Sequence, residues 1–356
     1  MSTRLNPNAR QALQRGLVIP ACPLALTSDK KLDDRRQRAL FRYYLAAGAG
    51  GLAVGVHTTQ FEIRDAAISL LQPVLELAVA EMNKEEIRRG APVVSIAGVC
   101  GRTKQAVKEA LQARELGYRA VLLSLGAWKT AGEDELIAHC REIAALIPLV
   151  GFYLQPAAGG RILAASFWRR FAEIQNVVAI KIAPFNRYQT LDVVRAVAES
   201  GRDDIALYTG NDDHILLDLI TPFRFKVQGK TTERRIVGGL LGHWAVWTEK
   251  AVELLDECHR LVQTAGAIPP EMLRRNEEIT DANAAFFDAA NGFAGCIPGI
   301  HEVLRREGLL EYTGCLDSRA TLSSGQAEEI DRVFNAYPHL SDRDFVQQHR
   351  DEWLRG

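Results

Sequence analysis

Short apolar runs alternate with longer amphipathic segments along the chain from about residue 17 onward. The runs are rich in Val, Ile and Leu, which is typical of buried strands, and the segments between them repeat apolar residues at helical spacings of three and four. This pattern predicts strands at 17–26, 50–56, 92–99, 119–125, 148–155, 177–183, 204–210 and 234–242. It predicts helices at 33–47, 66–90, 103–116, 133–146, 164–174 and 188–200.

Eight such units in roughly 250 residues are what a closed (β/α)8 TIM barrel requires, so we assign residues 1–255 to a barrel with an N-terminal lead-in. A doubly wound sheet would need fewer strands and a Gly-x-Gly-x-x-Gly turn after a strand. The sequence GAGG at 48–51 precedes a strand instead. The barrel is therefore the preferred fold.

Two regions depart from the repeat. Residues 221–234 are basic and contain turn signals, which predicts an excursion or a lid between the seventh helix and the eighth strand. After residue 266 the alternation stops and only helical patterns follow. We therefore expect residues 256–356 to form a C-terminal α-helical extension, which could cover the pocket or build a subunit contact.

Composition narrows the function classes. The 356 residues are 47% hydrophobic and 24% charged, with a formal net charge of -1, so nothing indicates a nucleic-acid or membrane partner. The six cysteines are scattered and the N-terminus has no apolar segment, which predicts reduced thiols in a cytoplasmic protein. The eight histidines show no metal-ligand spacing, so neither a metal nor a cofactor is expected.

The candidate chemistry lies at the C-terminal ends of the predicted strands, where barrel enzymes carry their reactive groups. Lys181 stands in the apolar run VVAIKIA. A desolvated lysine has a lowered pKa, and its neutral amine attacks carbonyl carbons to give a Schiff base. Other strand ends carry His57, Thr58, Thr59, Tyr153, Gly210, Asn211 and Asp212.

Each of these residues also has a structural interpretation. Lys181 could reach the barrel rim or pair with a carboxylate, and Tyr153 could be a core residue with its hydroxyl satisfied. His57 could be a hydrogen-bonded structural histidine or take part in acid-base work. Asn211 and Asp212 could line the pocket or cap the next helix.

Four segments in order resemble motifs of the dihydrodipicolinate synthase and N-acetylneuraminate lyase family of pyruvate-dependent, Schiff-base aldolases. GLAVGVHTTQFEIRD resembles its Gly-Thr-Thr-Gly-Glu loop, GFYLQPAAGGR its Tyr-Asn-x-Pro segment, VAIKIA its lysine strand, and YTGNDD its Gly-Asp/Asn-Asp turn. Tyr153 precedes Lys181 by 28 residues, which is also the family's usual interval. The resemblance covers about residues 17–255.

The resemblance implies a role for each matching position. Lys181 would form the Schiff base, Tyr153 would donate and accept protons, and Thr58 and Thr59 would bind the substrate carboxylate, with Thr58 also orienting the tyrosine hydroxyl. His57, which replaces the first glycine of the family's loop, and Gly210 and Asn211 are further candidates for substrate contact from their positions at strand ends. The family also implies a small-molecule 2-keto acid substrate and a homodimer or homotetramer.

Departures from the family pattern bear on the substrate. Ala158 occupies the position where the synthase branch carries an arginine for its second substrate, and Arg161 is the candidate replacement. We therefore expect a lyase, aldolase or dehydratase acting on pyruvate or a sugar-acid-type 2-keto acid rather than a true dihydrodipicolinate synthase. The alternative is a catalytically silent protein that binds such an acid. A phosphate-binding barrel enzyme is disfavoured because GNDDH is too acidic for an anion loop.

Overall fold

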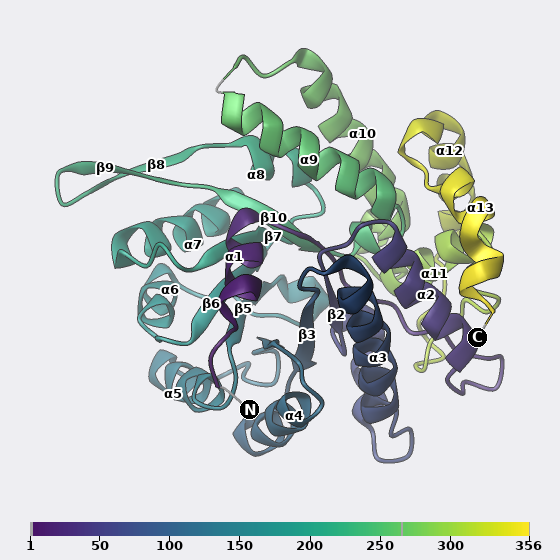
Figure 1. Ribbon diagram of the computed structural model, residues 1–356, viewed down its shortest axis with the longest axis horizontal. Helices are drawn as coiled ribbons and strands as arrows, with labels where there is room; N and C mark the ends of the chain where they lie inside the picture. Colours follow the sequence, from purple (N-terminus) through teal and green to yellow (C-terminus); the bar gives the residue numbers. More distant parts are fainter. Residues whose placement is uncertain (1–2, 265, 356) are drawn as a thin grey trace.

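The computed structural model describes residues 3–264 and 266–355, and eight parallel strands form its central sheet (Figure 1). The strand order is β1-β10-β7-β6-β5-β4-β3-β2, and a bridge from Ala21 to Ala53 joins the two ends of that order. The predicted (β/α)8 barrel is therefore confirmed. The strands are β1 (Val18–Pro20), β2 (Gly51–Val54), β3 (Val94–Val99), β4 (Ala120–Leu123), β5 (Leu149–Leu154), β6 (Val177–Ala183), β7 (Ala206–Thr209) and β10 (Ile236–Leu241).

Helices follow the strands around the barrel. They are α2 (Asp34–Ala46), α3 (Leu71–Arg89), α4 (Thr103–Glu115), α5 (Glu133–Ala144), α6 (Ala165–Ala172), α7 (Arg187–Ser200), α8 (Ile215–Ile220) and α9 (Thr248–Thr264). All six predicted helices are present. Helix α3 begins five residues later than its predicted start at residue 66, because a turn with Ser69 at φ 51° precedes it.

Residues 221–234 form an antiparallel hairpin of β8 (Phe223–Val227) and β9 (Lys230–Arg234). Gln228 and Gly229 both have positive φ, as a tight two-residue hairpin turn requires. The hairpin packs on α7 and leads into the N-terminal end of β10, and Arg234 pairs with Asp203 in the α7–β7 loop. Because αβ loops lie at the end of a barrel opposite its C-terminal mouth, this hairpin is an excursion and not a lid.

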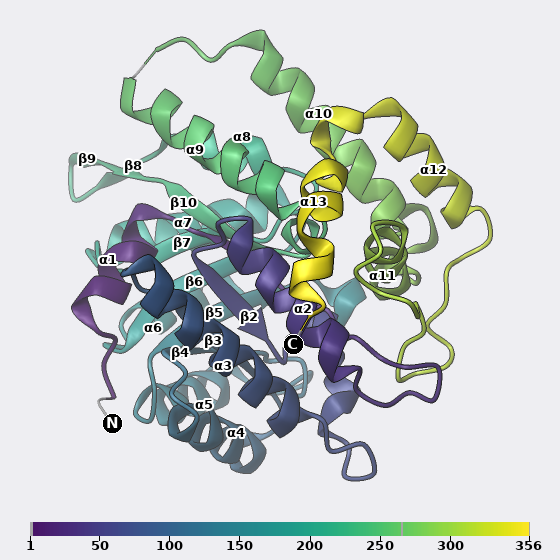
Figure 2. The ribbon, with the colours of Figure 1, turned by 45° about the vertical axis from the view of Figure 1, so that its right-hand side comes forward.

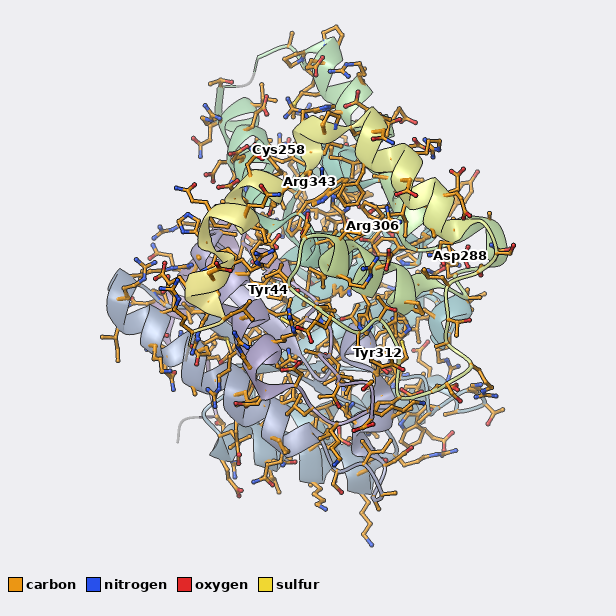
Figure 3. All side chains as sticks on the ribbon, turned by 90° about the vertical axis from the view of Figure 1, so that its right-hand side faces the viewer. Tyr44, Cys258, Asp288, Arg306, Tyr312 and Arg343 are labelled. Atoms are coloured by element: carbon orange, nitrogen blue, oxygen red, sulfur yellow. The ribbon has the colours of Figure 1, made fainter. Side chains whose placement is uncertain are left out.

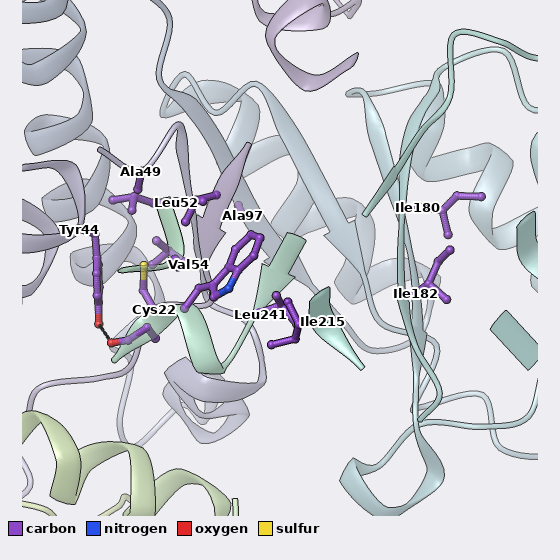
Figure 4. Packing of buried hydrophobic residues seen from close by; sticks show 14 of the residues in the cluster. Cys22, Tyr44, Ala49, Leu52, Val54, Ala97, Ile180, Ile182, Ile215 and Leu241 are labelled. Carbon is purple, nitrogen blue, oxygen red and sulfur yellow. Dashed lines mark hydrogen bonds between the residues drawn. The ribbon is translucent and has the colours of Figure 1, made fainter. Parts of the chain in front are cut away.

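The two faces of the barrel wall have different partners. Along β6, Ile180 and Ile182 belong to the outer cluster that packs under the helices (Figure 4), while Ala183 belongs to the inner cluster. Lys181 lies between the two isoleucines and so points inward, since neighbouring strand residues face opposite sides. Helix α1 (Pro7–Arg15) lies across the middle of the barrel in the view of Figure 1. Its Leu13 carbonyl accepts a hydrogen bond from the Tyr208 hydroxyl of β7 at 2.8 Å.

The C-terminal extension consists of helices on one side of the barrel (Figure 2). They are α10 (Pro270–Phe286), α11 (Cys296–Arg306), α12 (Gln326–Ala336) and α13 (Arg343–Trp353). Arg306 in α11 and Arg343 in α13 are labelled in Figure 3. The guanidinium groups of both lie over the Phe334 ring of α12. The predicted helical extension is confirmed. The division at residues 255 and 256 stays a prediction, and α9 runs across it.

The extension is fastened to the barrel through Asp342. One carboxylate oxygen of Asp342, Oδ2, accepts hydrogen bonds from the Tyr43 hydroxyl at 2.6 Å and the Glu249 N–H at 2.7 Å, and Oδ1 accepts one from the Lys250 N–H at 3.0 Å. The two N–H groups belong to the first turn of α9, which otherwise lacks acceptors. Asp342 therefore caps a barrel helix from a distant part of the chain.

Within the described residues, no helix combines the length and apolarity needed to cross a membrane.

Candidate functional site

A small pocket opens at the C-terminal ends of the barrel strands, with a cavity volume of about 100 Å³. This is well below the roughly 300–1,000 Å³ of pockets for drug-sized ligands. Its polar wall consists of His57, Thr58, Gln155, Lys181, Asp212 and Cys296. Its apolar wall includes Phe152, Leu154, Phe185, Phe287, Phe293 and Ile300.

Lys181 is the one cation among the described residues that line this pocket. Its side chain is only 8% exposed, and its Nζ lies 4.6 Å from the centre of the Phe152 ring on the neighbouring strand. No hydrogen bond or ion pair joins this amine to another residue in the described part of the chain. Burial lowers the pKa of Lys181 to about 8, and the carboxylate of Asp212 acts in the opposite direction. The amine therefore loses its proton at a lower pH than an ordinary lysine does.

Asp212 lies in the loop after β7 and faces the same pocket. Its Oδ1 accepts a hydrogen bond from the His243 N–H at 3.1 Å, and its backbone carbonyl accepts one from Asn283 Nδ2 at 2.7 Å. Burial raises the pKa of Asp212 to about 7, while the His243 N–H and then the nearby Lys181 oppose that rise. The sequence left open whether Asp212 lines the pocket or caps the next helix. The structure places it in the pocket lining.

The two predicted carboxylate-binding threonines lie in different environments. Thr58 lines the pocket, and its hydroxyl donates to the Ala21 carbonyl at 2.7 Å. Thr59 is fully buried outside the pocket lining, where its hydroxyl donates to the Cys22 carbonyl at 2.7 Å and accepts from the Gly55 N–H at 2.9 Å. Thr59 therefore holds the turn in shape, and Thr58 is the one that meets the pocket.

His57 also lines the pocket. Burial, together with the positive charge of Lys181, lowers the pKa of its imidazole to about 4. The ring is therefore neutral at physiological pH, so that one nitrogen donates and the other accepts.

Tyr153 lies outside the pocket. Its ring is fully buried against Trp168 of α6, with ring centres 5.2 Å apart. Its hydroxyl donates to the Leu163 carbonyl and accepts from the Leu163 N–H, both at 3.2 Å. Phe152 pairs with Lys181 in the sheet and faces the interior, so the next residue on the strand must face outward. The structure therefore does not bring Tyr153 to Lys181 or to Thr58, and its predicted proton-transfer role must be corrected.

Gly210 lies against the lysine, but Asn211 and Arg161 point elsewhere. Asn211 is fully buried behind the pocket, where its Nδ2 donates to Asp218 and its Oδ1 accepts from the Phe185 N–H at 3.0 Å. Arg161 donates to the backbone carbonyls of Trp128 and Ala131. Arg161 is absent from the described pocket lining, and Ala158 occupies the wall there. The predicted substitution of Arg161 for the missing synthase arginine is thus not supported by this geometry.

The sequence left open whether the extension covers the pocket or builds a subunit contact, and none of its residues was predicted to line the pocket. Phe287, Phe293, Cys296 and Ile300 all follow the barrel in sequence, yet they close one side of its pocket. The rings of Phe293 and Phe185 meet edge to face with centres 5.6 Å apart, and both residues have positive φ, 70° and 51°. Strained backbone of this kind clusters at ligand sites. The one sequence feature that could have indicated this wall is the stretch AAFFDAANGFAGC at 284–296, where phenylalanines stand among small residues.

Within the described residues, no group of three or more His, Cys, Asp or Glu side chains could hold a metal ion.

The model of the Dihydrodipicolinate synthetase family matches residues 15–221, which is more than half of the chain. The chain is 27% identical over 201 residues to 4-hydroxy-tetrahydrodipicolinate synthase of Bifidobacterium longum strain DJO10A, and this match covers 55% of the chain and 60% of that relative. The chain is also 27% identical over 214 residues to the enzyme of the same name from Moorella thermoacetica, and this match covers 58% of the chain and 67% of that relative. The chain thus spans about three fifths of the length of the first of these relatives.

Solved structures show the same fold. Dihydrodipicolinate synthase from Oceanobacillus iheyensis superposes with a TM-score of 0.73 at 15% identity, covering 91% of this chain and 97% of that one. YagE, a prophage protein of the same family from E. coli K12 solved in complex with pyruvate, superposes with a TM-score of 0.71 at 16% identity, covering 91% and 97%.

Proposed function

The chain belongs to the dihydrodipicolinate synthetase family, and on that premise we propose that it is a lyase or aldolase that forms a Schiff base between Lys181 and a 2-keto acid. The observation that carries this proposal is the position of Lys181, a buried amine with no hydrogen-bonding partner among the described residues, in the wall of a small pocket. A structural lysine would be expected to pair with a carboxylate or to reach solvent. A lysine kept unpaired and desolvated is a nucleophile.

The reaction would begin when the neutral amine attacks the keto carbon of the substrate. The resulting carbinolamine takes up a proton on its hydroxyl and loses water to give an iminium ion, which withdraws electrons from the C–H and C–C bonds that the adjacent carbon makes to its other substituents. Cleavage, condensation or dehydration at that carbon follows from this electron withdrawal. The substrate carboxylate would lie against His57 and Thr58, where the neutral imidazole offers one N–H donor.

The pocket lining supports pyruvate or a 2-keto acid with a short apolar chain better than the sugar-acid substrate expected from sequence. Six of its side chains are Phe, Leu or Ile, and several others are Ala. Each hydroxyl of a sugar acid would lose its bonds to water on entering this wall, at a cost of about 1–3 kcal/mol if unpaired. Ala158 is uncharged, so the described wall offers no cation besides Lys181 that could bind a second carboxylate.

Trapping the adduct tests this proposal. The protein is incubated with pyruvate and borohydride and analysed by intact and peptide mass spectrometry, beside Lys181→Ala and the exposed-lysine control Lys226→Ala. We expect one reduced adduct on Lys181, present in Lys226→Ala and absent from Lys181→Ala. Unmodified protein with pyruvate and with a panel of larger 2-keto acids would overturn the proposal.

A catalytically silent binding protein is the second candidate, and the outward position of Tyr153 favours it. Such a protein would be stabilised thermally by 2-keto acids without forming an adduct. The predicted homodimer or homotetramer stays a prediction, and light scattering of the purified protein measures it.

A further inference from the structure

A Schiff-base aldolase needs a group that moves a proton at the carbon next to the iminium. Tyr153 cannot reach this position in the structure, because its ring lies behind the barrel wall and its hydroxyl is engaged with both backbone groups of Leu163. Phe152, which takes the inward-facing position beside Lys181, has no proton to transfer. Another residue of the pocket must do this work if the protein is an aldolase.

The polar groups on the described pocket wall differ in their fitness for proton transfer. Thr58 already donates its hydroxyl proton to the Ala21 carbonyl. Burial raises the pKa of the Cys296 thiol to about 12, so it stays protonated. Gln155 does not titrate. His57 and Asp212 are the two remaining candidates for proton transfer. Of these, Asp212 is held in place by two hydrogen bonds, one to its side chain and one to its backbone carbonyl.

We propose that Asp212 is the proton-transfer residue of this pocket, taking the proton from the carbon adjacent to the iminium and returning it. The inference rests on the proposed Schiff-base function of Lys181. It assigns to a loop aspartate the work that the sequence pattern assigned to Tyr153.

The geometry holds Asp212 in place for this task. It follows Gly210 by two residues, and the Cα of Gly210 lies directly against the Lys181 side chain. The His243 N–H binds Oδ1, and Asn283 from the extension binds the backbone carbonyl, so both ends of the residue are anchored. Oδ2 receives no hydrogen bond from another residue in the described ranges. One oxygen therefore positions the carboxylate and the other is available to substrate.

Electrostatics supports the same assignment. Burial raises the pKa of Asp212, which makes its carboxylate a stronger base than an exposed aspartate. A base whose pKa lies near the working pH transfers protons most effectively. The imidazole of His57 has a pKa shifted downward by burial and by Lys181, which makes it a weaker base than an ordinary histidine.

The iminium carries a positive charge on the Lys181 nitrogen, which is doubly bonded to C2 of the keto acid. The Asp212 carboxylate removes a proton from C3, the C3–H electron pair forms the C2=C3 bond, and the C2=N pair returns to nitrogen. The products are a neutral enamine and protonated Asp212, which gives the proton back to C3 in the reverse direction.

Hydrogen exchange tests this step separately from Schiff-base formation. The full-length protein is incubated with pyruvate in D₂O, and loss of the pyruvate methyl signal is followed by NMR, while the trapped adduct on Lys181 is quantified in parallel. Lys181→Ala gives the uncatalysed baseline. Tyr153→Phe is the matched control, because it removes a hydroxyl that lies outside the pocket.

We expect Asp212→Asn to retain the Lys181 adduct and to lose about 100-fold or more in exchange rate per adduct, in the range typical of general acid-base groups. Tyr153→Phe should exchange within about twofold of wild type, since its hydroxyl does not meet the substrate. Wild-type exchange in Asp212→Asn, or loss of exchange in Tyr153→Phe or His57→Asn while Asp212→Asn remains active, overturns the assignment. Absence of any adduct in the wild type instead overturns the proposed function.

A second variant covers the case in which Asp212→Asn does not fold. Asp212→Ala leaves space for a small carboxylate, so added formate should restore exchange in this variant and leave Lys181→Ala at baseline. Exchange at the wild-type rate without formate would overturn the assignment.

Discussion

The Cα of Gly210, just after β7, lies against the Lys181 side chain on β6. A methyl group on Gly210 would lie 2.7 Å from Cε of Lys181 and 2.8 Å from Cβ of Ala183. Both distances are shorter than any ordinary contact between carbon atoms. The absence of a side chain at Gly210 therefore leaves the space that the Lys181 side chain occupies.

We expect Gly210→Ala to displace the Lys181 amine and slow adduct formation by about 100-fold, because a shift of about 1 Å in a reacting group can cost that much. Borohydride trapping with pyruvate over time measures the rate. Gly266→Ala is the control, since its added methyl would lie 3.8 Å from the nearest atom. An unchanged rate in Gly210→Ala would show that the lysine does not need this space.

Adduct formation should follow the ionisation of Lys181. The neutral amine is the reactive form, and burial places its pKa at about 8, below the ordinary value of about 10.4. The neutral fraction, and with it the initial rate, should therefore fall by about 50-fold between pH 8 and pH 6 and level off above pH 9. Cyanoborohydride trapping across this range measures it. A rate that keeps rising tenfold per unit up to pH 10 would contradict a lowered pKa.

The aromatic wall from the extension should limit the length of the substrate. Phe293 lines the pocket and meets Phe185, so Phe293→Ala opens the cavity on that side. We expect the adduct yield with 2-oxohexanoate, relative to pyruvate, to rise by at least about tenfold, which is the lower end of the effect of a single methylene in an apolar pocket. Tyr188→Ala, which removes a ring that is 82% exposed, serves as the control. An unchanged ratio would show that Phe293 does not bound the substrate.

Asp342 should contribute substantially to stability. Asp342→Ala leaves two N–H groups of the first turn of α9 without their acceptor and removes one of the two acceptors of the Tyr43 hydroxyl, the other being the Val246 carbonyl. We expect a loss of about 2 kcal/mol in the free energy of unfolding, from the lost cap and the unsatisfied buried groups. Urea denaturation followed by circular dichroism measures this value, and Asp344→Ala on the exposed side of α13 is the control. Equal midpoints for the two variants would contradict the capping role.

Local sequence patterns were sufficient for the barrel. The apolar runs and the 3.6-residue periodicity depend on near neighbours in the chain, so the eight strands, six of the helices between them and the position of Lys181 in a buried strand were all predictable. The helical nature of residues after 266 was predictable for the same reason.

Which face of β5 points inward was decided by tertiary structure. Parallel barrel strands are buried on both faces, so their sequences are apolar throughout and carry no alternation to distinguish inside from outside. In the segment GFYLQ, an irregularity in the pairing of β5 with β6 between Leu149 and Val150 sets the register that turns Phe152 toward Lys181 and Tyr153 toward α6. A one-residue change of register exchanges the two faces.

The composition of the pocket was likewise decided by long-range packing. Asp212, Phe287, Phe293 and Cys296 meet Lys181 only when the loop after β7 and the extension fold over the mouth of the barrel. The sequence by itself determined the barrel, the lysine and its strand. The residues that surround that lysine depend on contacts between segments about 30 to 120 positions apart, which no local pattern of apolar and polar residues encodes.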